Sequence, residues 1–195
     1  LQVQHQVASM FTPVNWPEIQ LHDWLQLNIK TKAIIGFDPW LHTVAEIEVL
    51  EADLVDSNIK LRSCQNLIDT IWTDRPPALN VKAWDHPLKY NGEDSISKIN
   101  KIAIKIKSLG GDLAIFTLPD SICWLLNIRG ADVTRTPIVH CFAALSSKGE
   151  VTVFGDQKKL KILNPHPKVE LLGWDDFEGF LTNSIGKVVV DRKSL

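Results

Sequence analysis

The sequence has few cysteines, and their spacing excludes two classes of small protein. Cys64, Cys123 and Cys141 are an odd number, lie in apolar surroundings and include no Cys-x-x-Cys pair. A zinc ribbon needs that pair, and a disulfide framework needs an even set in an oxidising compartment. We therefore expect three reduced, buried thiols in a cytoplasmic protein.

Long apolar runs and an excess of one charge are also missing. The 195 residues carry 21 basic and 23 acidic side chains, with a net charge of -2 and no basic patch, which argues against nucleic acid as a partner. The apolar runs are far shorter than a membrane span, and no signal-peptide pattern opens the sequence, so no membrane association is expected. The start, Leu-Gln-Val-Gln without methionine, suggests a fragment of a longer protein or a processed terminus.

The apolar content of 45% is sufficient for one large or two small packed domains. Residues 1–77 are predicted to form the first unit, and a proline-rich linker follows. Its helices are expected near 2–11, 17–29, 42–54 and 66–72, and its strands at 33–37 and 59–64. In the last of these helices, Leu67, Ile68 and Ile71 are expected to point inward.

Residues 78–195 are predicted to form an α/β domain, a mixed sheet with helices on its faces. Strands are expected at 112–118, 138–145, 151–154, 169–172 and 187–190. A helix is expected over 95–109 and a second over 175–181. The first should turn Ile96, Ile99, Ala103 and Ile106 inward and Lys98, Lys101 and Lys105 outward.

The stretch from Pro119 to His140 is the most informative part of the chain. Asp120 is a candidate N-cap of a short apolar helix, and Gly130 can adopt the positive φ that ends one. Between this helix and the next apolar run lies a polar loop, where binding residues tend to occur. Its candidate site residues are Asn127, Arg129 and Asp132.

This stretch resembles the middle domain of aminopeptidase P, the Xaa-Pro aminopeptidase family, which carries a run like Leu-Asp-Glu-Ile-Ala-Trp-Leu-Phe-Asn-Ile-Arg-Gly-Ser-Asp followed by proline. The matching residues are Asp120, Ile122, Trp124, Leu125, Asn127, Ile128, Arg129, Gly130, Asp132 and Pro137. Residues 35–40 and 66–76 resemble the end of the family's first domain. The family's Asp-Gly-Arg-Tyr segment, whose arginine contributes to substrate binding, has no counterpart here.

The resemblance implies two creatinase-type N-terminal domains: the C-terminal part of a first over residues 1–77, and a second over 78–195. It implies no catalytic residue and no cofactor in this chain, because the family's two divalent metals, manganese, lie in a separate catalytic domain. The expected role is to shape access of proline-containing peptides and to support a homodimer. Within it, Asn127, Arg129 and Asp132 are substrate-side or interface candidates.

Residues 130–136 also look like the tail of the family's metal motif, but we reject that interpretation. The motif needs a partner aspartate eleven residues before the second, and position 121 is Ser121. The histidines and tryptophans also indicate no catalytic or binding site. His140 is expected in the core, His166 in a surface loop, and the seven tryptophans mostly in the core.

The sequence leaves open the role of Arg129 and the function of the chain as a whole. Arg129 either braces its loop, paired with Asp120 or Asp132, or faces a substrate or a dimer partner. The chain as a whole is either part of an aminopeptidase P or a standalone pseudoenzyme that binds peptides or proteins. A third, unrelated possibility is a small-molecule-binding α/β domain, which would hold its ligand at the carboxyl ends of the strands.

Overall fold

The computed structural model describes residues 2–7, 9, 11–79 and 81–194, which fall into two compact units, residues 1–72 and 73–195. The contacts thus divide the chain five residues before the boundary at 77 expected from the prolines. Within the described ranges, no helix combines the length and apolar character needed to cross a bilayer.

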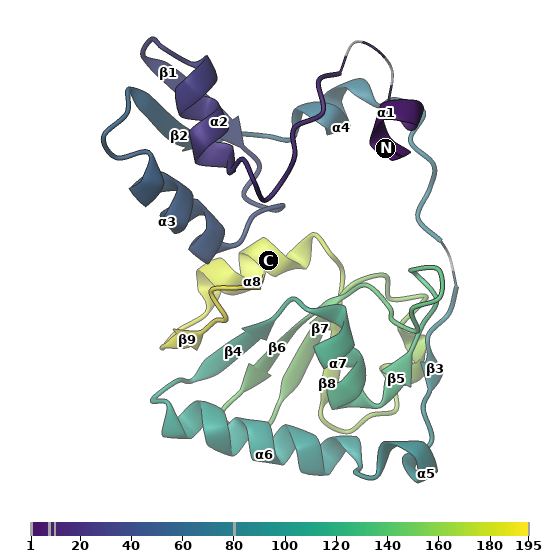
Figure 1. Ribbon diagram of the computed structural model, residues 1–195. Coiled ribbons are helices and arrows are strands. Elements are labelled where there is room, and N and C mark those ends of the chain that lie inside the picture. Colours follow the sequence, from purple (N-terminus) through teal and green to yellow (C-terminus); the bar gives the residue numbers. More distant parts are fainter. Residues whose placement is uncertain (1, 8, 10, 80, 195) are drawn as a thin grey trace. The chain divides into compact units, whose positions relative to one another are not determined.

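The first unit contains a two-stranded parallel sheet (Figure 1). Its elements are α1 (Gln2–Gln6), α2 (Leu21–Asn28), β1 (Ala33–Phe37), α3 (Val44–Asp53), β2 (Ile59–Ser63) and α4 (Leu67–Ile71). A capping box starts α3: Thr43 Oγ1 accepts the Glu46 N–H at 3.1 Å, and the Glu46 carboxylate accepts the Thr43 N–H at 2.8 Å. Leu25, Leu54 and Ile59 form its small core.

The apolar side chains of α4 are not inward, as the sequence analysis expected. Leu67, Ile68 and Ile71 are all exposed. Helical spacing identifies an apolar face, but it does not say whether another element covers that face.

The second unit contains a five-stranded mixed sheet in the order β8-β7-β6-β4-β9, together with a small β3–β5 pair. Its strands are β3 (Trp84–Asp85), β4 (Leu113–Phe116), β5 (Ile128–Arg129), β6 (Phe142–Ser146), β7 (Val151–Phe154), β8 (Val169–Leu172) and β9 (Val188–Val189). Its helices are α5 (Leu88–Asn91), α6 (Ser95–Ser108), α7 (Pro119–Leu126), the 3-10 turn η1 (Lys161–Leu163) and α8 (Asp176–Asn183). The predicted mixed α/β fold is confirmed.

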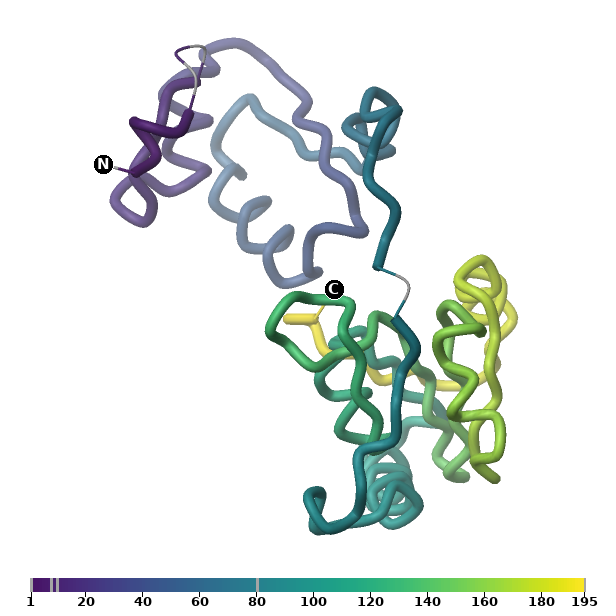
Figure 2. Tube along the Cα trace, turned by 90° about the vertical axis from the view of Figure 1, so that its right-hand side faces the viewer, coloured from purple at the N-terminus to yellow at the C-terminus, as the bar shows by residue number. Residues whose placement is uncertain are grey.

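Helices cover the sheet on its two faces, and two cores result (Figure 1). The larger core packs α6 and α7 on one face through residues such as Ile99, Ile122 and Val153. On the other face, Phe177 of α8 contacts Phe142 and Phe154, with ring centroids 4.9 and 5.1 Å apart. Figure 2 follows the chain trace after a quarter turn.

The expected strand over 138–145 is wrong in its first half. The β6 ladder begins at Phe142, and residues 137–141 form an irregular segment instead. Val139 is buried without a sheet partner, and its N–H points to Cys123 Sγ at 3.5 Å. Apolar character shows that this segment is buried, but not that it forms a ladder.

Candidate functional site

The candidate site begins at α7, whose first turn differs from the sequence prediction. The N-cap is Leu118, Pro119 opens the helix, and Asp120 lies inside the first turn. The Asp120 carboxylate accepts the Ser121 N–H at 2.8 Å. Proline suits the first helical position, because an N–H at this position has no acceptor within the helix and proline has no N–H.

Asn127 ends α7 and joins three elements. It adopts the left-handed conformation, with φ 54°, which asparagine tolerates better than most residues. Its buried side chain accepts from Lys98 Nζ at 2.7 Å and donates to the Glu93 carbonyl at 2.9 Å, while its own carbonyl accepts the His86 N–H at 2.8 Å. Asn127 therefore fixes the end of α7 against α6 and β3.

Gly130 does not supply the left-handed residue that the sequence analysis assigned to it. It is glycine because the backbone of residues 138–139 approaches closely. A Cβ at this position would lie 2.6 Å from Val139 Cβ and 2.7 Å from the Ile138 carbonyl oxygen. The loop can therefore fold back on itself only without a side chain here.

Arg129 braces the backbone, but not through the partners the sequence suggested. It lies half-buried in β5, and its Nη1 donates to the carbonyls of Cys123 at 3.2 Å and Ile128 at 2.8 Å. In the described ranges it forms no ion pair with Asp120 or Asp132. Since Cys123 is in the last turn of α7, the guanidinium also meets the negative end of that helix.

Asp132 forms a buried ion pair that the sequence did not indicate. Its Oδ1 lies 2.7 Å from Lys159 Nζ, and the two side chains are only 3% and 9% exposed. Its Oδ2 accepts the His140 N–H at 2.9 Å. The carboxylate thus ties the loop after β5 to the segment after β7.

The three candidate side chains therefore have separate sets of partners. Asn127 binds Lys98, Arg129 binds backbone carbonyls, and Asp132 binds Lys159. Lys98 and Lys159, both buried, are residues that the sequence did not mark as part of the site.

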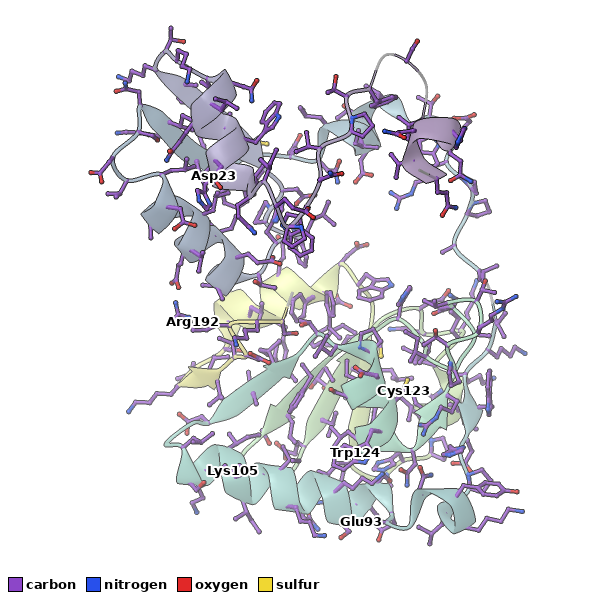
Figure 3. All side chains as sticks on the ribbon, viewed as in Figure 1. Asp23, Glu93, Lys105, Cys123, Trp124 and Arg192 are labelled. Atoms are coloured by element: carbon purple, nitrogen blue, oxygen red, sulfur yellow. The ribbon has the colours of Figure 1, made fainter. Side chains whose placement is uncertain are left out.

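Lys98 is buried and does not lie on the outer face of its helix, where the sequence analysis expected it. Its Nζ also donates to the Trp124 carbonyl at 2.8 Å and lies 4.6 Å from the Trp124 ring. Figure 3 labels Trp124 on α7 and Glu93 just before α6.

The cysteine prediction is confirmed for two residues and wrong for the third. Cys123 and Cys141 are buried free thiols, and burial raises the pKa of both, although the nearby Arg129 acts in the opposite direction on Cys123. Cys64 is free but exposed. Thiols held in the protonated form are poor nucleophiles, so Cys123 and Cys141 are packing residues.

The histidine and tryptophan placements also need correction. His140 is exposed and outside the sheet. All seven tryptophans have exposed side chains, with Trp24 the least exposed at 39%. Large aromatic residues are rarely buried completely, and their scatter along the chain did not show how each would be covered.

A cavity of about 400 Å³ lies between β3, the start of α6 and the loop after η1, and His86, Ser95, Asn127 and His166 are among its lining residues. His166 Nδ1 accepts the Lys168 N–H at 3.2 Å, so in the neutral ring Nε2 carries the proton and donates to Ser95 Oγ at 2.9 Å. His166 is therefore a donor to this hydroxyl and does not serve as its base.

Acidification is expected to weaken the second unit through His166. Burial, and secondarily the Lys168 charge, lowers the His166 pKa from its ordinary value of 6.5. Because the unfolded chain then binds the proton more readily, the free energy of unfolding should fall as the pH drops below about 6.5 and level off below the folded-state pKa. The measurement is the difference in unfolding free energy between native protein and His166→Gln as a function of pH. A difference that stays constant would contradict the prediction.

A second cavity, of about 540 Å³, lies in the first unit at the carboxyl ends of β1 and β2. Several of its polar groups already serve the local backbone: the Asp38 carboxylate accepts the Trp40 N–H, and the Asn66 side chain accepts the Ile68 N–H, both at 2.9 Å. Ligands of α/β proteins bind at such strand ends, but these contacts mark no ligand class.

Metal ligands do not gather in the part of the chain that the structure describes: no three His, Cys, Asp or Glu side chains lie together as a metal site would require. Asp132 belongs to residues 130–136, which look like the tail of the family's metal motif, but its carboxylate already faces the Lys159 ammonium. These residues therefore do not fit a dinuclear metal centre.

Several known proteins are similar to this chain. Residues 74–195 match the family model described as Creatinase/Prolidase N-terminal domain. Aminopeptidase P1 of Lotus japonicus is 33% identical over 138 residues, covering 70% of this chain and 21% of the relative. Xaa-Pro aminopeptidase app-1 of Caenorhabditis elegans is 30% identical over 167 residues, covering 80% of this chain and 27% of the relative.

The fold has a solved counterpart in the X-prolyl aminopeptidase of C. elegans, described as a cytosolic enzyme with a di-nuclear active site. The TM-score is 0.79 at 27% identity, over 87% of this chain and 28% of that one. This chain thus spans about a quarter of the length of the relatives it matches. With more than half of its residues inside the matching model, the chain belongs to the creatinase/prolidase N-terminal domain family.

Proposed function

We propose that this chain is a non-catalytic N-terminal and middle part of a cytoplasmic Xaa-Pro aminopeptidase, a metallopeptidase that removes the residue before proline. Residues 1–77 are the C-terminal part of a first creatinase-like domain, and residues 78–195 are the second. The supporting observation is the match to X-prolyl aminopeptidase, which covers most of this chain but only 28% of that enzyme.

In this proposal the chemistry belongs to a region outside the chain. The family neighbour has a di-nuclear active site, whereas the residues described here do not fit one. Two divalent metals, manganese, would activate water there and polarise the peptide carbonyl. This chain contributes no hydrolytic step, and instead limits access to short proline-containing peptides and supports a homodimer.

The test is a peptidase assay of the purified chain with manganese and the peptide Ala-Pro-Ala, with the C. elegans enzyme as positive control. We expect release of alanine by the control and none by this chain. Hydrolysis that copurifies with the chain through successive columns would overturn the proposal. If the chain is inactive but binds proline-free peptides or proteins equally well, the standalone binding module becomes the better interpretation.

A further inference from the structure

Arg129 uses only part of its hydrogen-bonding capacity. A guanidinium has five N–H donors, and Nη1 directs its two to the carbonyls of Cys123 and Ile128. In the described part of the chain, Nε and Nη2 of Arg129 make no hydrogen bond or ion pair. Every buried side-chain nitrogen there has a partner, so these two atoms are not buried. The remaining edge of the guanidinium is therefore held still and open to solvent.

Among the residues that the structure describes, no carboxylate forms an ion pair with this edge. The carboxylates nearest in sequence are engaged elsewhere, Asp120 with the Ser121 N–H and Asp132 with Lys159. A second cation, the buried Lys98, lies on the other side of the α7 C-terminus, where its Nζ binds the carbonyl next to the one that Arg129 binds. Glu93 and Asp94 already lie near Lys98, whereas no described carboxylate pairs with Arg129, so the half-buried guanidinium is the cation that attracts an anion.

Trp84 gives the site an apolar wall. It pairs directly with Arg129 across the antiparallel β3–β5 ladder, which places both side chains on the same face about 5 Å apart at Cβ. Its side chain is 43% exposed, while the neighbouring Asp85 alternates to the other face. An indole beside an open guanidinium edge suits a ligand with a carboxylate next to an apolar group.

We propose that Arg129 and Trp84 form a binding site for the C-terminal carboxylate of a short peptide. Arg129 Nε and Nη2 donate in parallel to the two carboxylate oxygens, which is the geometry that distinguishes arginine from lysine. The last side chain of the peptide lies on the Trp84 ring. The inference deepens the proposed function and rests on it for the identity of the peptide, because a site for the free C-terminus would select short substrates.

The experiment is a titration of the full chain with Ala-Pro-Leu and with its C-terminal amide, followed by the NMR signals of the Trp84 indole N–H and the Arg129 Nε–H. Charge-assisted bonds to a carboxylate predict that the acid binds roughly ten- to a hundred-fold more tightly than the amide. Arg129→Gln should lose this preference, and Trp84→Ala should weaken binding of the acid. Arg135→Gln, which removes an exposed arginine of the same unit, is the matched control and should bind like the native chain.

Equal binding of acid and amide to the native chain would overturn the inference, even if Arg129→Gln fails to fold. Acetate binding as tightly as Ala-Pro-Leu would also overturn it, because the site would then be a general anion site. So would an acid preference that survives in folded Arg129→Gln. The proposed function fails on a different result, release of alanine from Ala-Pro-Ala by this chain, which is measured in a separate assay.

Discussion

Asp132→Asn is expected to lower the free energy of unfolding of the second unit by about 3–5 kcal/mol, the cost of removing one member of a buried ion pair. The Lys159 ammonium lies 2.7 Å from the Asp132 carboxylate, and both side chains are almost inaccessible. Asparagine has nearly the same shape as aspartate, so the packing is retained while the counter-charge is lost. Most of the cost is that of a buried charge left without its partner.

The measurement is hydrogen exchange of the β6 and β7 amides, which reports on this unit independently of residues 1–72. Lys101→Gln is the matched control, because it removes the mostly exposed member of the Lys101–Glu93 pair and should leave exchange close to native. The double variant Asp132→Asn with Lys159→Met should recover much of the loss, since no charge is then left buried. A single variant as stable as the control would show that the pair does not hold the loop.

The elements best predicted from the sequence are those specified by local pattern. The strand over 33–37 matches β1, those over 151–154 and 169–172 match β7 and β8, and the helix over 95–109 differs from α6 by one residue. Each is a short apolar run or an amphipathic repeat bounded by turn residues. The mixed sheet with helices on both faces follows from the order of these elements.

Burial was harder to predict than secondary structure. Leu67, Ile68, Ile71 and Cys64 are apolar or thiol residues that the structure leaves exposed. Whether an apolar face is covered depends on elements distant in sequence, and periodicity carries no information about them. Residues 137–141 show the same limit. This segment is partly buried, as predicted, but it packs against the loop after β5 and does not pair as a strand.

For the candidate site, the sequence located the loop but not its contacts. Asn127, Arg129 and Asp132 do lie between α7 and the following apolar segment, as the turn residues suggested. Their partners come from other elements: Lys98 is 29 residues from Asn127, and Lys159 is 27 residues from Asp132. Only the three-dimensional arrangement shows that these side chains are bound and which edge of Arg129 stays open.

Lys98→Met is expected to destabilise the second unit by about 3 kcal/mol, because it leaves one buried and one partly buried acceptor without their charged donor. These are Asn127 Oδ1 at 2.7 Å and the Trp124 carbonyl at 2.8 Å, both at the end of α7. The methionine side chain is similar in length to that of lysine and suits apolar surroundings, so the substitution removes little volume. The sequence carried a weak indication of this burial, since Lys98 is four residues before Ile102, on the same stripe of α6 as Ile106.

Lys101→Met on the same helix separates this effect from the loss of a lysine in general. Lys101 is mostly exposed and pairs only at the surface, so its replacement should change the stability little. Hydrogen exchange of the α6 and β6 amides measures both variants, and the Trp124 indole signal reports the lost ammonium above its ring. Equal effects of the two substitutions would mean that the ammonium of Lys98 contributes no more than a solvated one. A selective loss in Lys98→Met would show that this buried cation fixes Asn127, and through it the backbone that carries Arg129.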